Sequence, residues 1–100
     1  MLEISNKADG ASLTMVLSGR VDTVTAPELD AAIEGIPADV MALTLDLADV
    51  EYISSAGLRV LLKTKKAMDN RGGTFAVANV PTLIQETFEM TGLSEIMLSE

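Results

Sequence analysis

Two adjacent serines, Ser54 and Ser55, are the residues of this chain best placed for chemistry. They occur in the segment YISSAGLRV, where an extended run gives way to a helical pattern. A serine at a helix start commonly accepts a free N–H of the first turn, an interaction worth about 1 kcal/mol. A helix N-terminus also favours negative charge, so a serine hydroxyl there could carry a phosphoryl group. The pair therefore predicts either two structural turn residues or one cap and one modification site.

The residues that follow the serines are small. Ala56 and Gly57 leave the predicted helix start open to a large partner. Gly57 costs roughly 0.5–1 kcal/mol in a helix interior relative to alanine, which favours a close backbone approach at this position.

Composition excludes much other chemistry. The chain has no histidine and no cysteine, so Ser-His-Asp and Cys-His arrangements and the usual zinc ligands are missing. It also lacks a P-loop and a GxGxxG motif. Enzymes built from carboxylates or lysine stay open in principle, but no spacing favours one. We therefore expect a protein that is not an enzyme, without a metal or cofactor.

Charge and hydropathy limit the partners. The net charge of −8 argues against nucleic-acid binding, which needs clustered Lys and Arg. No apolar run approaches the ~18 residues of a membrane span, and the first residues do not form a secretion signal. These features predict a cytoplasmic protein without direct membrane insertion, and the charged surface favours a monomer.

Basic residues are concentrated in one stretch. Five of the seven fall between positions 59 and 71, where Asp69 is the one acid, so this stretch carries +4 and the rest of the chain −12. Arg59, Lys63 and Lys66 are spaced i, i+4 and i+7 and should project from one outer helix face. A solvated face and a partner-facing patch both fit this pattern.

Apolar patterning predicts the elements that position these residues in a single domain over residues 1–100. A hairpin should turn at Asp9-Gly10, and the run VMALTLDL indicates a strand covered on both faces, followed by a short acidic connection, DVEY. The expected elements, in order, are strands over 2–5 and 12–19, a helix from about 25, a strand over 40–47, a helix over 55–70, a strand over 74–78, a helix that stops at Gly92, and an edge strand, SEIML. This β-β-α-β-α-β-α-β order predicts an open mixed α/β sheet with helices packed on it and right-handed crossovers.

The helices show recognisable ends and buried stripes. Thr25 and Glu28 fit a capping box, with Pro27 tolerated in the first turn. The residues expected to face the core are Leu29, Ala32, Ile33 and Ile36 in the first helix, Leu58, Leu61, Leu62 and Met68 in the second, and Leu83, Ile84, Thr87 and Phe88 in the third.

The central segment LDLADVEYISSAGLRVLL resembles the signature of STAS-domain anti-sigma factor antagonists, small proteins of bacterial partner-switching circuits. The resemblance extends to LSGRVDTVTAPEL, to the GG before the late strand, and to FEMTGLSEIML, so it spans nearly the whole chain. It implies a STAS fold and a protein that regulates transcription by binding, not by catalysis.

The resemblance also implies a mechanism. Such proteins bind an anti-sigma factor that is a serine kinase, are inactivated when it phosphorylates them, and are restored by a serine phosphatase. The phosphorylated serine, two positions before glycine, corresponds to Ser55. Ser54 stands where the best-known members have aspartate, and Ala56 stands where Ser or Thr is usual. The missing acid could alter kinase recognition or mark a subgroup with another partner.

The expected contact surface contains Asp22, Thr23, Ser54, Ser55, Ala56, Gly57, Arg59 and Lys63. Asp22 matches an acidic residue near the phosphorylation loop of the family, although a turn or helix-entry acid fits equally well. Two alternatives stay open. One is a STAS subunit of a stressosome-like or lipid-transport assembly in which Ser55 is unmodified, and the other is a nucleotide-binding protein.

Overall fold

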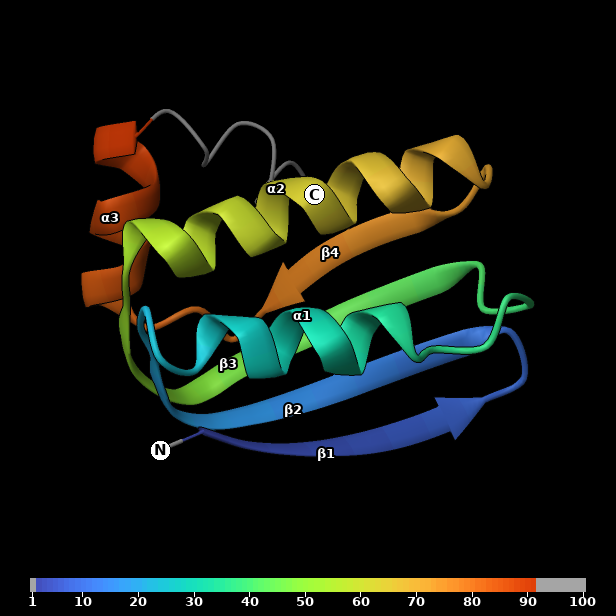
Figure 1. The fold of residues 1–100 in the computed structure, drawn as a ribbon, viewed down its shortest axis with the longest axis horizontal. Helices are drawn as coiled ribbons and strands as arrows, with labels where there is room; N and C mark the ends of the chain where they lie inside the picture. Colours follow the sequence, from blue (N-terminus) through green and yellow to red (C-terminus); the bar gives the residue numbers. More distant parts are fainter. Residues whose placement is uncertain (1, 92–100) are drawn as a thin grey trace.

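The computed structural model describes residues 2–91, which form a four-stranded mixed sheet and three helices (Figure 1). Strands β1 (Leu2–Asp9) and β2 (Ser12–Val21) pair antiparallel through a tight turn. Gly10 adopts a φ of 61° in this turn, a conformation that glycine takes without steric strain. The predicted hairpin is confirmed, and both strands are longer than their sequence patterns indicated.

The rest of the chain adds two parallel crossovers and a final helix. Helix α1 (Ala26–Glu34) connects β2 to β3 (Ala42–Ile53), and α2 (Ser55–Asn70) connects β3 to β4 (Thr74–Ala78). The sheet order is β1-β2-β3-β4, with β2, β3 and β4 parallel. Both crossovers advance in the same direction across the sheet, so crossovers of one hand place α1 and α2 on the same face. Figure 1 shows this arrangement, with α3 (Thr82–Thr91) near the end of the sheet at which β4 terminates.

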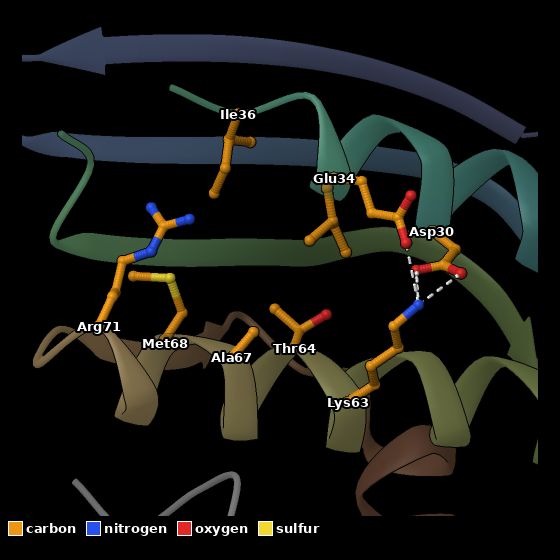
Figure 2. Close-up of a pocket in the computed structure, with 9 residues that line it drawn as sticks. Asp30, Glu34, Ile36, Lys63, Thr64, Ala67, Met68 and Arg71 are labelled. Carbon is orange, nitrogen blue, oxygen red and sulfur yellow. Dashed lines mark hydrogen bonds and ion pairs between the residues drawn. The ribbon is translucent and has the colours of Figure 1, made fainter. Parts of the chain in front are cut away.

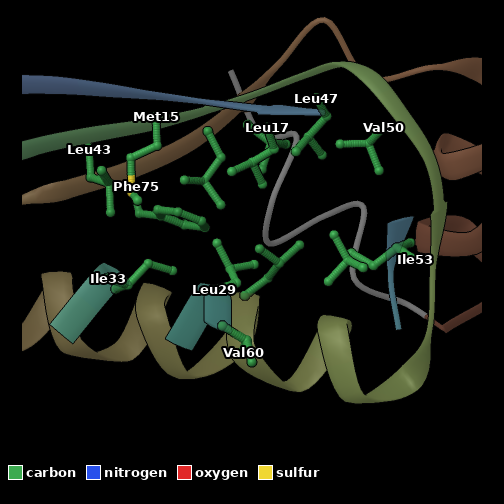
Figure 3. Close-up of a cluster of buried hydrophobic side chains, with 14 of the residues drawn as sticks. Met15, Leu17, Leu29, Ile33, Leu43, Leu47, Val50, Ile53, Val60 and Phe75 are labelled. Atoms are coloured by element: carbon green, nitrogen blue, oxygen red, sulfur yellow. The ribbon is translucent and has the colours of Figure 1, made fainter. Parts of the chain in front are cut away.

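One apolar core lies between the sheet and the two covering helices. Strand residues such as Met15, Leu43 and Phe75 meet helix residues such as Leu29 and Val60 there (Figure 3). The predicted inward stripes of α1 and α2 are confirmed, except that Ile36 lies beyond the end of α1, and Ala32, Ile36 and Leu62 are only partly buried. Burying these side chains holds the sheet and helices together and thereby fixes where the interelement loops lie.

Strand β3 differs from its prediction in length and in covering. The segment DVEY is part of the strand, not a connection, and Ala42, Thr44 and Asp46 are partly exposed, so only one face is fully buried. The pairing of β2 with β3 contains irregularities between Val16 and Ser18 and between Gly19 and Arg20. Such bulges break the two-residue alternation of a strand, so the sequence pattern does not predict a strand over this segment. Strand β2 likewise continues past Gly19, its predicted end.

Two helix predictions are wrong in detail. Thr25 makes no side-chain cap to α1, because its hydroxyl faces back toward β2, so the expected capping box with Glu28 does not form. On α3, Ile84 and Phe88 are buried as predicted, but the Leu83 side chain is 65% exposed and Thr87 only partly buried, because α3 contacts the domain along a narrow stripe. The predicted stop at Gly92 and the edge strand SEIML lie outside the described residues.

Candidate functional site

The fold brings two loops together at the carboxyl ends of parallel strands. Val21 and Ile53 are paired as β2 and β3 end, and the Ser54 N–H donates to the Val21 carbonyl at 2.8 Å. The β2–α1 loop and the start of α2 therefore lie side by side. In open α/β sheets the carboxyl ends of the strands are where binding residues gather. Asp22 and Ser54, identified separately in the sequence, are thus brought to one edge.

Ser54 is the N-cap of α2. Its backbone is extended, with φ −90° and ψ 174°, and its Oγ accepts the Gly57 N–H at 3.3 Å. The Ser54 carbonyl accepts the first intrahelical bond, from the Leu58 N–H at 2.9 Å. The side-chain contact satisfies the Gly57 N–H, one of the donors that a helix start otherwise leaves unpaired.

Ser55 is the first helical residue and is exposed. Within residues 2–91 its hydroxyl makes no hydrogen bond. The capping function and the free hydroxyl are therefore divided between the two serines, an assignment that the sequence left open.

Gly57 faces the core rather than the surface. It is buried, and a Cβ placed on it would lie 2.6 Å from Cγ1 of Val21 and 2.8 Å from Cγ1 of Ile53. Glycine at this position lets the first turn of α2 pack directly on the ends of β2 and β3. Gly57 therefore serves close packing within the core, and the expectation that it leaves the helix start open to a partner is wrong. Ala56, by contrast, is partly exposed.

Asp22 organises the β2–α1 loop. Its Oδ1 accepts the N–H groups of Val24 and Thr25, both at 3.0 Å, and its own N–H donates to Thr25 Oγ1 at 2.9 Å. The hydrogen bond from the Thr25 N–H, with a smaller contribution from Val24, lowers the pKa of Asp22 below its ordinary value. Asp22 is therefore the turn and helix-entry acid that one interpretation of the sequence expected, and it lies beside Ser54.

An aromatic and a cation extend this edge. The Arg20 guanidinium carbon lies 4.5 Å from the centroid of the Tyr52 ring, and Arg20 Nε lies 4.0 Å from Asp22 Oδ2. Tyr52 is 42% exposed and Val24 is 75% exposed. No sequence pattern marked Arg20, Tyr52 or Val24 as site residues. Tyr52 lies in DVEY, which the sequence predicts to be a connection and the structure shows to be part of β3.

Lys63, on α2, forms ion pairs with two acidic residues of α1. Its Nζ lies 3.0 Å from Asp30 Oδ2 and 3.0 Å from Glu34 Oε2, as Figure 2 shows. Hydrogen bonds to Glu34 and then to Asp30 raise the pKa of Lys63. The i, i+4 spacing of the two acids on α1 was the signal from which this cross-helix contact could have been inferred.

Most basic residues between positions 59 and 71 thus form ion pairs or hydrogen bonds within the domain. Lys65 pairs with Asp69 at 2.9 Å, and Arg71 donates to the carbonyls of Val40 and Pro37. Among the residues that the structure describes, Arg59 and Lys66 have no such partner. Both are exposed on α2, so the patch available to a binding partner is smaller than the sequence indicated.

A shallow groove of about 330 Å³ lies between the starts of α1 and α2. It combines four of the predicted contact residues, namely Thr23, Ala56, Arg59 and Lys63, with Ala26, Pro27, Asp30 and Val60. The predicted surface is therefore contiguous, except that Gly57 is buried beneath it. Within residues 2–91 no cluster of acids could hold a metal ion, and no helix there is long and apolar enough to cross a membrane.

Comparison with known proteins places this geometry in a family. The family model described as "Mlab, STAS domain" matches residues 4–99. BtrV of Bordetella bronchiseptica, assigned as an anti-sigma factor antagonist, is 33% identical over 92 residues, which are 91% of this chain and 78% of that protein. The anti-sigma-B factor antagonist of Bacillus subtilis is 26% identical over 96 residues, which are 96% of this chain and 88% of the relative.

A solved structure agrees with the sequence relatives. The crystal structure of an anti-sigma factor antagonist from Mycobacterium paratuberculosis matches with a TM-score of 0.86 and 28% identity, over 97% of this chain and 83% of that one. The strand and helix order, the serine-bearing junction after β3 and these matches lead to one conclusion. The chain belongs to the STAS domain family.

Proposed function

We propose that this protein is a cytoplasmic anti-sigma factor antagonist that binds an anti-sigma factor with serine kinase activity and is inactivated by phosphorylation of Ser55. One observation carries the proposal: Ser54 caps α2, whereas the Ser55 hydroxyl is exposed and makes no hydrogen bond within residues 2–91. A modification of Ser55 would leave the helix cap in place. The relatives named as anti-sigma factor antagonists support the same function.

The proposed reaction is a phosphoryl transfer catalysed by the partner. The Ser55 Oγ forms a bond to the γ-phosphorus of ATP, the bond from that phosphorus to the bridging oxygen breaks, and ADP leaves. The hydroxyl proton passes to a base on the kinase. This protein contributes an accessible nucleophile, and the partly exposed Ala56 next to it leaves room for the kinase. A serine phosphatase hydrolyses the phosphate and restores the active form.

Charge accounts for the loss of binding. A phosphate adds about −1.5 to −2 charges at pH 7 to a protein whose net charge is already −8. The unmodified junction, which is built from small side chains, is a surface that a partner can cover. Placing a phosphate dianion there against a partner that offers no matching cation costs several kcal/mol of binding free energy. Each 1.4 kcal/mol lowers affinity about tenfold. Phosphorylation would therefore release the partner while the domain stays folded and monomeric.

A second function remains in competition within the same family. In this alternative the protein is a STAS subunit of a stressosome-like or lipid-transport assembly, and Ser55 is never modified. Ser54, in place of the common aspartate, is the feature that favours it. Both functions predict a binding protein that is not an enzyme, so the phosphorylation state of Ser55 separates them.

The deciding experiment is intact-mass analysis and phosphopeptide mapping of the protein purified from its native cells. Wild type is compared with Ser55→Ala, Ser54→Ala and Ser12→Ala, the last being an exposed serine at the start of β2. The proposal is supported if the protein carries one phosphate that disappears only in Ser55→Ala. A kinase should also bind the unmodified form and be absent from the phosphorylated form. Unmodified Ser55 in every sample, together with a stably bound assembly, would establish the alternative.

A further inference from the structure

We infer that Arg59 is the internal counter-ion for a phosphate group on Ser55. The inference deepens the proposed function and rests on its assignment of Ser55 as the modified residue. Because it concerns the phosphorylated chain itself, it can be tested without identifying the kinase.

Position along α2 brings the two side chains together. Ser55 and Arg59 are four residues apart in one helix, and both are exposed. Residues at i and i+4 lie about 5–6 Å apart between their Cβ atoms. Long side chains in a helix lean toward its N-terminus, so the Arg59 guanidinium can reach the turn that contains Ser55. The acid-before-base order is also the favourable one for an i, i+4 ion pair.

Arg59 is available for this contact, whereas its basic neighbours are mostly engaged. Within residues 2–91 Arg59 has no ion pair, while Lys63, one turn further on, is held by Asp30 and Glu34. The first turn of α2 contains no acidic residue that would compete for Arg59. A planar guanidinium can donate two hydrogen bonds to one phosphate, which a lysine cannot do with the same geometry.

The other charged residues that line the groove, and Asp22 in the adjoining loop, already have partners. Asp30 and Lys63 border the same groove as Arg59 and are paired with each other. In the adjoining loop Asp22 accepts backbone N–H groups and lies 4.0 Å from Arg20. Arg59 is thus the one cation without an ion pair among the residues that line this groove, and pairing with the phosphate would withdraw that cation from a partner.

The test is a ³¹P NMR titration of the full chain with phosphoserine incorporated at position 55 during translation. If Arg59 pairs with the phosphate, Arg59→Gln should raise the second pKa of the phosphate by roughly 0.3–0.7 of a pH unit at low salt. Arg59→Lys should give a smaller rise. Lys66→Gln, which removes an exposed cation from the same helix three turns away from Ser55, should leave the titration unchanged.

Each outcome decides the inference. An Arg59-specific shift that shrinks in 1 M salt supports the pairing, because exposed ion pairs are screened. An unchanged titration in Arg59→Gln, or an equal shift in Lys66→Gln, overturns it. Neither result bears on whether a kinase modifies Ser55 in cells, so failure of this inference remains distinguishable from failure of the proposed function.

Discussion

At the scale of single residues, Ser54 and Ser55 differ in what their hydroxyls contact. Ser54 Oγ accepts the Gly57 N–H, and the Ser55 hydroxyl makes no hydrogen bond among the described residues. We therefore expect Ser54→Ala to lower the free energy of unfolding by about 1 kcal/mol, the usual effect of losing an N-cap. Ser55→Ala should change it by less than about 0.5 kcal/mol, as surface substitutions usually do.

Urea denaturation of the two variants beside wild type measures this difference. Equal losses for both serines, or a larger loss for Ser55→Ala, would contradict the assigned cap. The result would also show that any loss of partner binding in Ser55→Ala does not come from unfolding.

Asp22 gives a pH-dependent prediction. Hydrogen bonds from the Thr25 and Val24 N–H groups lower its pKa below the ordinary 3.8, so the charged carboxylate favours the folded state. That contribution is present above pH 3.8 and is lost as the pH falls through the lowered value. Asp22→Asn should therefore unfold more easily than wild type at pH 6, and the difference should narrow below pH 3.8. Denaturation curves at several pH values check this, and a pH-independent difference would refute it.

At the scale of elements, the packing of α2 on the strand ends depends on Gly57. A Cβ there would lie within 2.8 Å of Val21 and Ile53 side-chain atoms, too close without a shift. We expect Gly57→Ala to destabilise the domain by about 1–3 kcal/mol, despite the better helix propensity of alanine.

Gly35→Ala is the matched control. A Cβ at Gly35 would meet only ordinary contacts at 3.6 Å, so this variant should stay within about 0.5 kcal/mol of wild type. Thermal unfolding monitored by circular dichroism compares the two. A neutral Gly57→Ala would show that α2 can move away from the strands at little cost.

The contact between α1 and α2 through Lys63 makes a second prediction at this scale. Pairing with Glu34 and Asp30 raises the pKa of Lys63 above its ordinary 10.5, so its stabilising effect is complete below pH 10.5 and is lost as the pH rises through the raised value. Lys63→Met should be less stable than wild type at pH 8, with a gap that narrows above pH 10.5 and in 1 M salt. Lys66→Met, which removes no ion pair among the described residues, is the control. A difference in stability between Lys63→Met and wild type that is insensitive to both pH and salt would mean that the ion pairs do not stabilise the fold.

At the scale of the whole molecule, phosphorylation should change charge without changing shape. The net charge would fall from −8 to about −10. Because Ser55 is exposed and α2 is capped by its neighbour, amide chemical-shift changes should be confined to the β2–α1 loop and the first turns of α2. Comparison of ¹⁵N–¹H spectra of the unmodified and phosphoserine proteins tests this. Changes that reach β1 or the middle of β4 would indicate a global rearrangement.

The sequence by itself determined the local elements and the order in which they occur. The Asp9-Gly10 turn, the apolar stripes of α1 and α2, and the start of α2 at Ser55 follow from short-range patterns, because capping, turn chemistry and helical periodicity act over a few residues. The family resemblance also rests on a contiguous motif.

Only the tertiary structure decided how residues distant in sequence share the site. It turned Gly57 toward Val21 and used Lys63 to hold α1. It also extended β3 through an irregular pairing with β2, so that Tyr52 stacks with Arg20. These outcomes depend on which surfaces meet when the sheet and helices pack, and no window of the sequence contains both partners of such a contact.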